Sequence, residues 1–253
     1  IADIVDPRIR LVRNERNLGL AASLNLGIDL ARGEYLARMD QDDVSYPERF
    51  AIQVHSLQSN PSLDLVAVRC LAINSDNQLL GVLPFAITHQ EICSAPWRGF
   101  YMAHPAWMGK VHWFRQHRYA TPGPYFCEDQ ELILRTYRTS QFYTVPEILL
   151  AYRLRDRIDW CKSFRTRITL LRLRLNHFFS QRQLHFCVMA FFAFIGFAKD
   201  LFNLRPMNFK LPGIYSYYKI PEDSCERLRW RGVLSLFSRW PEAINRNIEG
   251  IAK

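Results

Sequence analysis

The sequence has no cysteine pair in a spacing that binds a metal or forms a redox centre. Its six cysteines are spread along 253 residues, without a CxxC pair and without a regular spacing to histidine. This pattern argues against a zinc site and against a disulfide framework. Cysteines scattered among apolar residues are typical of reduced, buried thiols, and they favour a cytoplasmic protein.

A long hydrophobic run is also missing. The longest segment without Asp, Glu, Lys or Arg covers residues 183–198. As a helix it would be roughly 24 Å long at about 1.5 Å per residue, against a hydrocarbon core of roughly 30 Å. In-plane or re-entrant insertion, a marginal span and burial against the protein all remain open for this segment.

Basic excess is absent from the first part of the chain and concentrated in the last. Residues 1–152 contain 14 Lys or Arg and 16 Asp or Glu, whereas residues 153–253 contain 19 and 8. We therefore divide the chain into a region 1–155 and a basic, mostly helical region 156–253. Such an asymmetry indicates an anionic partner for the second region, either lipid headgroups or nucleic acid.

Lipid is the favoured partner of this basic region. Its arginines between residues 164 and 178 interleave with apolar residues, as in a basic amphipathic helix on an anionic membrane surface; they are Arg165, Arg167, Arg172 and Arg174. Trp230 and the tyrosines of 215–218 are candidates for base stacking, but no recognised module is present, so no nucleic acid is predicted. Prolines interrupt residues 203–253, which predicts a loosely packed or partly disordered cap.

Three carboxylates follow a predicted strand near the start of the chain. The apolar pattern predicts a helix over residues 18–32 and a buried strand over residues 35–39. Asp40, Asp42 and Asp43 then stand at the carboxyl end of that strand, where open α/β sheets bind ligands. Oxygen ligands in this spacing suit Mg²⁺ or Mn²⁺, which can bridge a substrate diphosphate.

Further elements are predicted downstream. A helix is expected over residues 47–59, with Phe50, Val54 and Leu57 on one face. Ser45 and Pro47 suit the start of this helix, so the alternative explanation of the acidic turn is that it caps the helix. The remaining predicted elements are two strands joined by a turn and one acidic helix, at residues 65–71, 79–83 and 128–138.

Several motifs, in this order, resemble those of the family 2 glycosyltransferases. They lie between residues 8 and 155 and comprise Asn17-Leu18-Gly19, Asn25, Gly33-Glu34-Tyr35, Asp40-Gln41-Asp42-Asp43, His104-Pro105 with Trp107-Met108, Glu128-Asp129 with Arg135, and Val145 to Arg153. The resemblance implies an α/β fold of the GT-A type, with a Rossmann-like mixed sheet flanked by helices. It also implies transfer of a sugar from a nucleoside-diphosphate sugar to an acceptor hydroxyl.

The resemblance assigns chemical roles to two acidic motifs. Asp42, helped by Asp40, would hold a divalent cation that stabilises negative charge on the leaving diphosphate. Asp129 is the candidate base for the acceptor hydroxyl in a single, inverting displacement, and Glu128 is the alternative base. Helix capping is the plainer explanation of this second pair.

Other positions are carried over from the same motifs. The resemblance places Asn17, Gly19, Asn25 and Asp40 at the nucleotide and His104 and Trp107 at the acceptor side. Gly19 is equally explained as a loop requirement, Asn25 as a satisfied polar group of a helix, and His104 as a structural histidine. The implied setting is bacterial surface polysaccharide or glycolipid assembly, with a saccharide or lipid-linked acceptor at the inner face of the cytoplasmic membrane.

Domains of this family open with strands that hold the nucleotide base, and this chain begins at Ile1 in what resembles the end of that portion. We therefore expect a truncated domain with exposed apolar sheet edges and poor solubility. A monodisperse protein that unfolds cooperatively would contradict this expectation. A non-catalytic, membrane-associated remnant of such an enzyme is the corresponding alternative.

The acidic motif also fits other classes of protein less well. Asp40 to Val44 matches the Asp-x-Asp-x-Val pattern of haloacid-dehalogenase-like phosphatases, in which Asp40 would be the nucleophile. That class also needs a downstream lysine and a second acidic pair, and Lys110 is the only lysine before Lys162. An EF-hand is excluded because Ser45 stands where the loop requires glycine.

Overall fold

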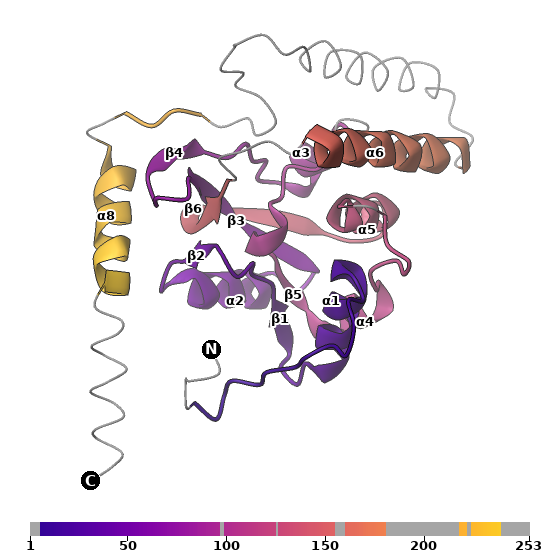
Figure 1. Cartoon of the computed structure of the whole chain (residues 1–253), viewed down its shortest axis with the longest axis horizontal. Helices are drawn as coiled ribbons and strands as arrows, with labels where there is room; N and C mark the ends of the chain where they lie inside the picture. The colour runs from indigo at the N-terminus through magenta and orange to yellow at the C-terminus, as the bar shows by residue number, and fades with distance from the viewer. Residues whose placement is uncertain are drawn as a thin grey trace.

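The computed structural model describes residues 6–96, 99–124, 126–154, 160–180, 218–221 and 224–238. One mixed sheet runs through this part of the chain, with helices packed around it (Figure 1). Its strands are β1 (Tyr35–Ala37), β2 (Val44–Ser45), β3 (Leu65–Ile73), β4 (Leu79–Val82), β5 (Met108–Lys110) and β6 (Phe142–Arg153). The helices are α1 (Leu20–Leu30), α2 (Arg49–Ser59), α3 (His89–Ile92), the 3₁₀ turn η1 (His104–Ala106), α4 (Val111–Gln116), α5 (Glu128–Thr136), α6 (Trp160–Ser180) and α8 (Cys225–Ser238).

Two long strands form the centre of the sheet. β3 and β6 pair in parallel, from Leu65 opposite Phe142 to Ile73 opposite Arg153. The strand order is β1-β5-β3-β6-β2, with β4 antiparallel to β3. Nearly every residue of β3 is buried, as expected for a strand covered on both faces. The short strands β1 and β2 therefore lie at opposite ends of this order, and the segment between them passes from one side of the sheet to the other.

Helix α2 packs against the sheet through polar side chains. Arg49 and Gln53 are fully buried, and the amide of Gln53 donates to the carbonyls of Val66 (3.0 Å) and Ala106 (2.8 Å). The predicted inner face was therefore wrong in part, because Phe50 is exposed. A hydrophobic pattern cannot identify this face, since buried polar groups are tolerated where they satisfy backbone carbonyls.

Most of the predicted elements are confirmed, with changes at their ends. Residues 18–32 contain α1, residues 128–138 contain α5, and the turn at residues 74–77 joins β3 to β4. The strand predicted over residues 35–39 is shorter, and it is half-buried instead of buried, with Ala37 and Met39 exposed. The reason is that β1 pairs only with β5 in the described sheet.

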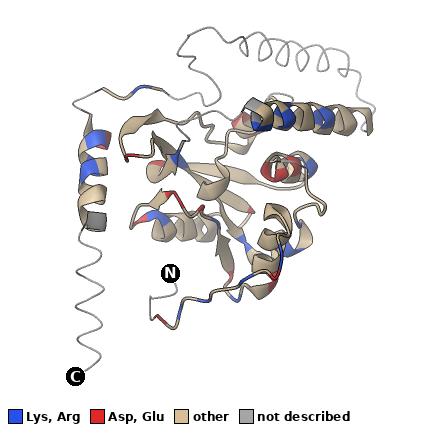
Figure 2. Cartoon of the chain, viewed as in Figure 1, with Lys and Arg blue, Asp and Glu red and all other residues tan. Residues whose placement is uncertain are grey.

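Within the described part of the basic C-terminal region, two helices pack differently (Figure 2). α6 packs against α5, whereas α8 lies beside β2 and β4 (Figure 1). Trp230 and Val233 of α8 are buried in the core, and the Trp230 ring stacks against Tyr46, so the loosely packed cap predicted for residues 203–253 was wrong for α8. Burial also removes Trp230 as a candidate for base stacking.

The membrane prediction for residues 183–198 lies outside the described residues. Among the helices that the structure does describe, none combines the length and the apolar character needed to cross a bilayer.

Candidate active site

The acidic loop, residues 38–43, begins with an ion pair. Arg38 Nη2 lies 2.5 Å from Asp40 Oδ1, and Arg38 Nη1 donates to Asp40 Oδ2 at 2.8 Å. The Arg38 side chain is 6% exposed and that of Asp40 is 37% exposed. The backbone of Arg38 is fixed on both sides, because its N–H donates to the Trp107 carbonyl and its carbonyl accepts from Arg49 Nη2. The Asp40 carboxylate is therefore held by the buried Arg38 guanidinium, and part of its surface remains in solvent.

The other two carboxylates of the loop have different surroundings. Asp42 is exposed, whereas Asp43 is buried and its Oδ1 accepts the backbone N–H of Arg153 at 2.8 Å. The pKa of Asp43 is raised to about 7, mainly by burial and also by the charges of Asp40 and Asp42, against the hydrogen bond from Arg153 and the charge of Arg38. The three carboxylates thus divide into an outward pair, Asp40 and Asp42, and an inward residue that supports the loop.

The capping alternative for the acidic turn does not describe this geometry. α2 begins at Arg49, its N-cap Glu48 makes no side-chain capping bond, and the Ser45 hydroxyl donates to the Tyr46 carbonyl. The acidic side chains therefore remain available for another role.

A second acidic pair stands at the start of α5. Glu128 is buried and Asp129 is half-buried, and both carboxylates accept hydrogen bonds from backbone N–H groups of the first turn, whereas the N-cap residue Cys127 makes no side-chain capping bond. Burial raises the pKa of both carboxyls above their ordinary values. The N-terminal end of the helix dipole favours negative charge here, so the two effects oppose each other. A carboxylate whose pKa is raised in this way is a better proton acceptor than an exposed one.

Arg38 connects the two acidic groups electrostatically. Besides its ion pair with Asp40, its positive charge lowers the pKa of both Glu128 and Asp129. The charge of Asp40, in turn, raises the pKa of Glu128. The loop after β1 and the N-terminus of α5 are therefore parts of one site, although about 90 residues separate them in the sequence. The motif interpretation missed Arg38, whose position two residues before Asp40 was the only available signal.

The histidine of the His-Pro motif lies at the base of this site. His104 is buried, its Nε2 lies 2.7 Å from the Tyr119 hydroxyl, and its ring packs edge-on against Trp107. Burial, and then the charge of Arg38, hold the pKa of His104 well below its usual value, so the ring is neutral at pH 7. Trp107 has no exposed surface. The predicted acceptor contacts of these two residues therefore have no support in this geometry, which agrees with the structural alternative for His104.

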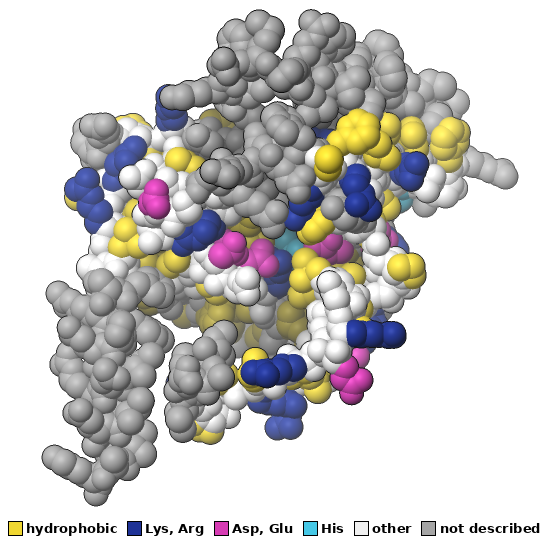
Figure 3. All heavy atoms as spheres, in the orientation of Figure 1, with side chains coloured by type: hydrophobic (Ala, Val, Ile, Leu, Met, Phe, Trp, Pro, Cys, Tyr) yellow, Lys and Arg dark blue, Asp and Glu magenta, His cyan; other side chains and the backbone are white. Residues whose placement is uncertain are grey.

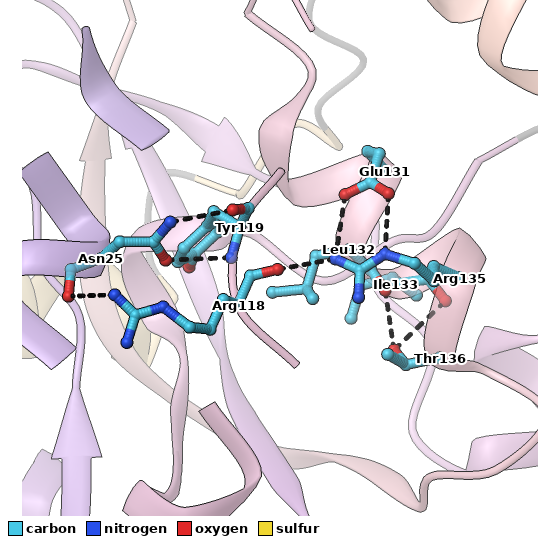
Figure 4. Close-up of polar contacts among 8 residues, drawn as sticks. All are labelled: Asn25, Arg118, Tyr119, Glu131, Leu132, Ile133, Arg135 and Thr136. Atoms are coloured by element: carbon cyan, nitrogen blue, oxygen red, sulfur yellow. Dashed lines mark hydrogen bonds and ion pairs between the residues drawn. The ribbon is translucent and has the colours of Figure 1, made fainter. Parts of the chain in front are cut away.

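Hydrogen bonds connect the loop at residues 118–119 to Asn25 of α1 and to Arg135 of α5 (Figure 4). The Asn25 amide donates to the Tyr119 carbonyl at 2.8 Å, and its Oδ1 accepts the Tyr119 N–H at 3.0 Å. Arg135 of α5 donates to the Arg118 carbonyl at 2.7 Å and pairs with Glu131 at 2.8 Å. The amide nitrogen and oxygen of Asn25 are thus both hydrogen-bonded inside the protein, as expected for a satisfied polar group of a helix. The loop at residues 118–119 joins α1 to α5 through these bonds and the bond from Arg135.

The Asn-Leu-Gly motif forms the turn before α1. Asn17 Oδ1 accepts the Gly19 N–H at 2.9 Å, and Gly19 has φ +80°. Glycine is favoured at this backbone angle, so the loop requirement explains Gly19. Both residues are exposed, and their contact with a nucleotide stays a prediction.

The outward carboxylates fit a divalent cation only in part. No cluster of three or more His, Cys, Asp or Glu side chains placed to hold a metal occurs within the described ranges. Asp40 and Asp42 supply two carboxylates, and Mg²⁺ is often held by one or two carboxylates together with substrate phosphates and water. The donor set therefore suits a cation that arrives with a diphosphate. In the space-filling view, acidic, basic and histidine side chains gather in the middle of one face (Figure 3).

Comparisons with known proteins find the same family that the motifs resemble, over the first part of the chain. Residues 1–118 match the family described as "Glycosyl transferase family 2". An uncharacterized glycosyltransferase of Methanocaldococcus jannaschii is 26% identical over 189 residues, which cover 74% of this chain and 64% of that protein. The amylovoran biosynthesis glycosyltransferase AmsE of Erwinia amylovora is 42% identical over 55 residues, 22% of this chain and 21% of that protein. The chain thus spans less than two thirds of the length of these relatives.

A solved structure gives the same fold. Residues 1–349 of S. aureus TarS superpose with a TM-score of 0.50 at 12% identity, over 77% of this chain and 57% of that one. The predicted GT-A-like α/β fold and the resemblance to family 2 glycosyltransferases are therefore confirmed. The family match ends at residue 118, so it includes the acidic loop and the His-Pro motif but not Glu128 and Asp129.

Proposed function

We propose that this chain, whose residues 1–118 fall within glycosyl transferase family 2, is the catalytic part of an inverting glycosyltransferase. It moves a sugar from a nucleoside-diphosphate sugar to an acceptor hydroxyl. The observation that carries the proposal is the convergence of two acidic groups on Arg38: the outward pair Asp40 and Asp42, and the more buried pair at the start of α5. These pairs match the two tasks of the reaction, which are stabilising the leaving group and accepting a proton.

The acidic loop binds the donor diphosphate. Asp42 and the outward side of Asp40 hold Mg²⁺ or Mn²⁺, which supplies Lewis-acid stabilisation of negative charge on the departing phosphate. Arg38 fixes the Asp40 carboxylate in two directions, so this ligand does not have to be ordered when the donor arrives. Asn17 and Gly19, exposed at the start of α1, belong to the donor side in this proposal.

The start of α5 accepts the proton of the acceptor hydroxyl. Asp129 is the proposed base because the residue is only half-buried, whereas Glu128 is buried, and because burial has raised the pKa of the Asp129 carboxyl. The charge of Asp129 also raises the pKa of Glu128 beside it. A single displacement with Asp129 on the acceptor side inverts the anomeric centre.

The acceptor is proposed to be a saccharide or lipid-linked saccharide of a surface polysaccharide or glycolipid. The similarity to AmsE of Erwinia amylovora, a glycosyltransferase of amylovoran biosynthesis, supports this class of acceptor. The exposed face of α6 supports a site at an anionic membrane surface, since it carries both large apolar and basic side chains: Phe164, Arg165, Arg172 and Phe179. Phe178 is buried and Arg174 is half-buried, so only this part of the predicted amphipathic helix faces outward.

Calorimetric titration with UDP and GDP, with and without Mn²⁺, tests the donor site. We expect Mn²⁺-dependent binding of at least one nucleotide by the wild type, and its loss in Asp42→Ala. Asp76→Ala, a change of an exposed aspartate in the β3–β4 turn, is the matched control. Binding that needs no metal, or that survives in Asp42→Ala, would remove the proposed role of the acidic loop.

Sedimentation with phosphatidylglycerol vesicles tests the membrane face. Neutralising both arginines in Arg165→Gln/Arg172→Gln should weaken binding roughly 30-fold, at about 1 kcal/mol for each basic residue near the surface. Arg115→Gln/Arg231→Gln removes the same charge from two exposed arginines on other helices. Equal losses in the two double variants would show a general charge effect and not a docking face.

A further inference from the structure

Arg153, the last residue of β6, joins two loops that are far apart in the sequence. Its Nε donates to the Asp42 carbonyl at 2.8 Å, and its Nη2 donates to Asn77 Oδ1 at 2.6 Å. Its Nη1 donates to the carbonyls of Asn74 (2.6 Å) and Ser75 (3.2 Å). One guanidinium therefore connects the acidic loop to the turn between β3 and β4.

The acidic loop has little support of its own. The bond from the Asp43 N–H to the Asp40 carbonyl is long, at 3.4 Å, and β2, which follows the loop, has only two residues. Arg153 supplies two shorter contacts, because its backbone N–H also donates to Asp43 Oδ1 at 2.8 Å. The backbone at the exposed Asp42 is thus supported by a residue 111 positions away in the sequence.

Helix α8 holds both ends of this connection. Trp230 Nε1 donates to the Asn77 carbonyl at 3.1 Å, and the Trp230 ring stacks against Tyr46, three residues after Asp43. Arg229 lies over the Tyr46 ring at 4.9 Å and reaches Glu48 Oε2 at 3.3 Å. The helix therefore contacts the β3–β4 turn on one side and the segment that leaves the acidic loop on the other.

We infer that Arg153 is the positioning residue of the acidic loop and that α8 locks it there, so that cation and diphosphate binding depend on the C-terminal helix. The ligand in this inference rests on the proposed function, whereas the mechanical connection does not. An arginine is needed because its planar fork donates in several directions at once, and a lysine offers only a compact point charge. Partners that orient a metal ligand from behind typically change metal affinity by roughly 10–100-fold.

Two measurements on the full chain test this inference together. Hydrogen exchange of the peptide covering residues 39–48 reports the order of the loop, and Mn²⁺ titration followed by electron paramagnetic resonance, with and without UDP, reports ligand binding. Arg153→Lys should speed exchange of this peptide and weaken Mn²⁺ binding about 10-fold. Trp230→Phe, which keeps an aromatic ring but removes the bond to Asn77, should shift both readouts in the same direction by a smaller amount.

Matched controls separate this effect from general destabilisation. Arg115→Lys changes an exposed arginine bonded to the Ala31 carbonyl, and Leu228→Ala changes an exposed residue of α8; neither should alter either readout. If Arg153→Lys does not fold, Asn77→Gly removes one Arg153 acceptor while tolerating the φ of +61° at that position. It should produce the same faster exchange at residues 39–48.

The outcomes distinguish this inference from the proposed function. Unchanged exchange at residues 39–48 in Arg153→Lys, or in Asn77→Gly in its place, overturns the inference whatever the metal does. If the wild type binds no Mn²⁺ with or without UDP, the proposed donor site fails, and the exchange data still decide whether Arg153 and α8 hold the loop. Faster exchange with unaltered Mn²⁺ affinity overturns the coupling to ligand binding.

Discussion

The acidic loop and the N-terminus of α5 each present adjacent carboxylates, yet their surroundings are opposite. In the loop, Asp42 is exposed and Asp40 is paired with the Arg38 guanidinium. At α5, Glu128 is buried, Asp129 is half-buried, and burial raises the pKa of both. Exposed, ionised carboxylates suit a divalent cation, whereas a carboxyl with a raised pKa suits proton transfer. Two groups of carboxylates are thus proposed to have different tasks because their burial and their neighbouring charges differ.

The largest expected effect comes from removing the proposed base. Asp129→Asn should lower the rate of sugar transfer about 10²–10⁴-fold, because a positioned general base contributes about that much. Nucleotide and Mn²⁺ affinity, measured by calorimetry, should stay as in the wild type. Glu131→Gln is the control, since Glu131 is in the same helical turn but pairs with Arg135. A larger loss in Glu128→Gln than in Asp129→Asn would exchange the roles of the two residues.

The next effect distinguishes the three carboxylates of the loop. Asp40→Asn should weaken Mn²⁺-dependent UDP binding by about 10-fold or more, because it removes a charged ligand and its pairing with Arg38. Asp43→Asn should leave this affinity unchanged, since the variant retains the oxygen that accepts from Arg153. Calorimetry on both variants makes the test. Equal weakening by the two changes would return Asp43 to the ligand set.

A pH profile examines how Arg38 links the two groups. The positive charge of Arg38 lowers the pKa of Glu128 and Asp129, so Arg38→Gln should let both pKa values rise. Because the base must be ionised to accept a proton, the acid limb of the kcat profile should move to higher pH. Arg118→Gln, which removes an arginine paired with Asp29, should not move it. An unshifted limb in Arg38→Gln would mean that the two acidic groups act independently.

The smallest effect concerns stability. The folded-state pKa of Glu128 is raised above its unfolded value, so its contribution to stability is fully present below the unfolded pKa and is lost as pH rises through the folded pKa. At pH 8, Glu128→Gln should therefore have a free energy of unfolding about 0.5–2 kcal/mol higher than that of the wild type, measured by urea denaturation. The advantage should disappear near pH 4. A difference that does not change with pH would assign it to packing.

Local patterns predicted the elements that carry the site, but not the contacts that shape them. Apolar periodicity located α1, β3 and α5 within a few residues, because their own sequences favour those structures. At α2 it found the helix and the buried Leu57 but not the buried polar Arg49 and Gln53, and at α8 the nearby prolines wrongly suggested disorder. In both cases the preference of a short segment was overridden by partners elsewhere in the chain: backbone carbonyls for Gln53 and Tyr46 for Trp230.

The amino-acid order was enough to establish which carboxylates exist, that a strand precedes the first group, and that a helix begins at the second. The raised pKa of Glu128 and Asp129 was decided by folding, because burial and the charge of Arg38 act through space across segments that are distant in the chain. The same holds for the support of the acidic loop. Arg153 reaches Asp42 only because β6 pairs with β2 and ends beside the turn at Asn77.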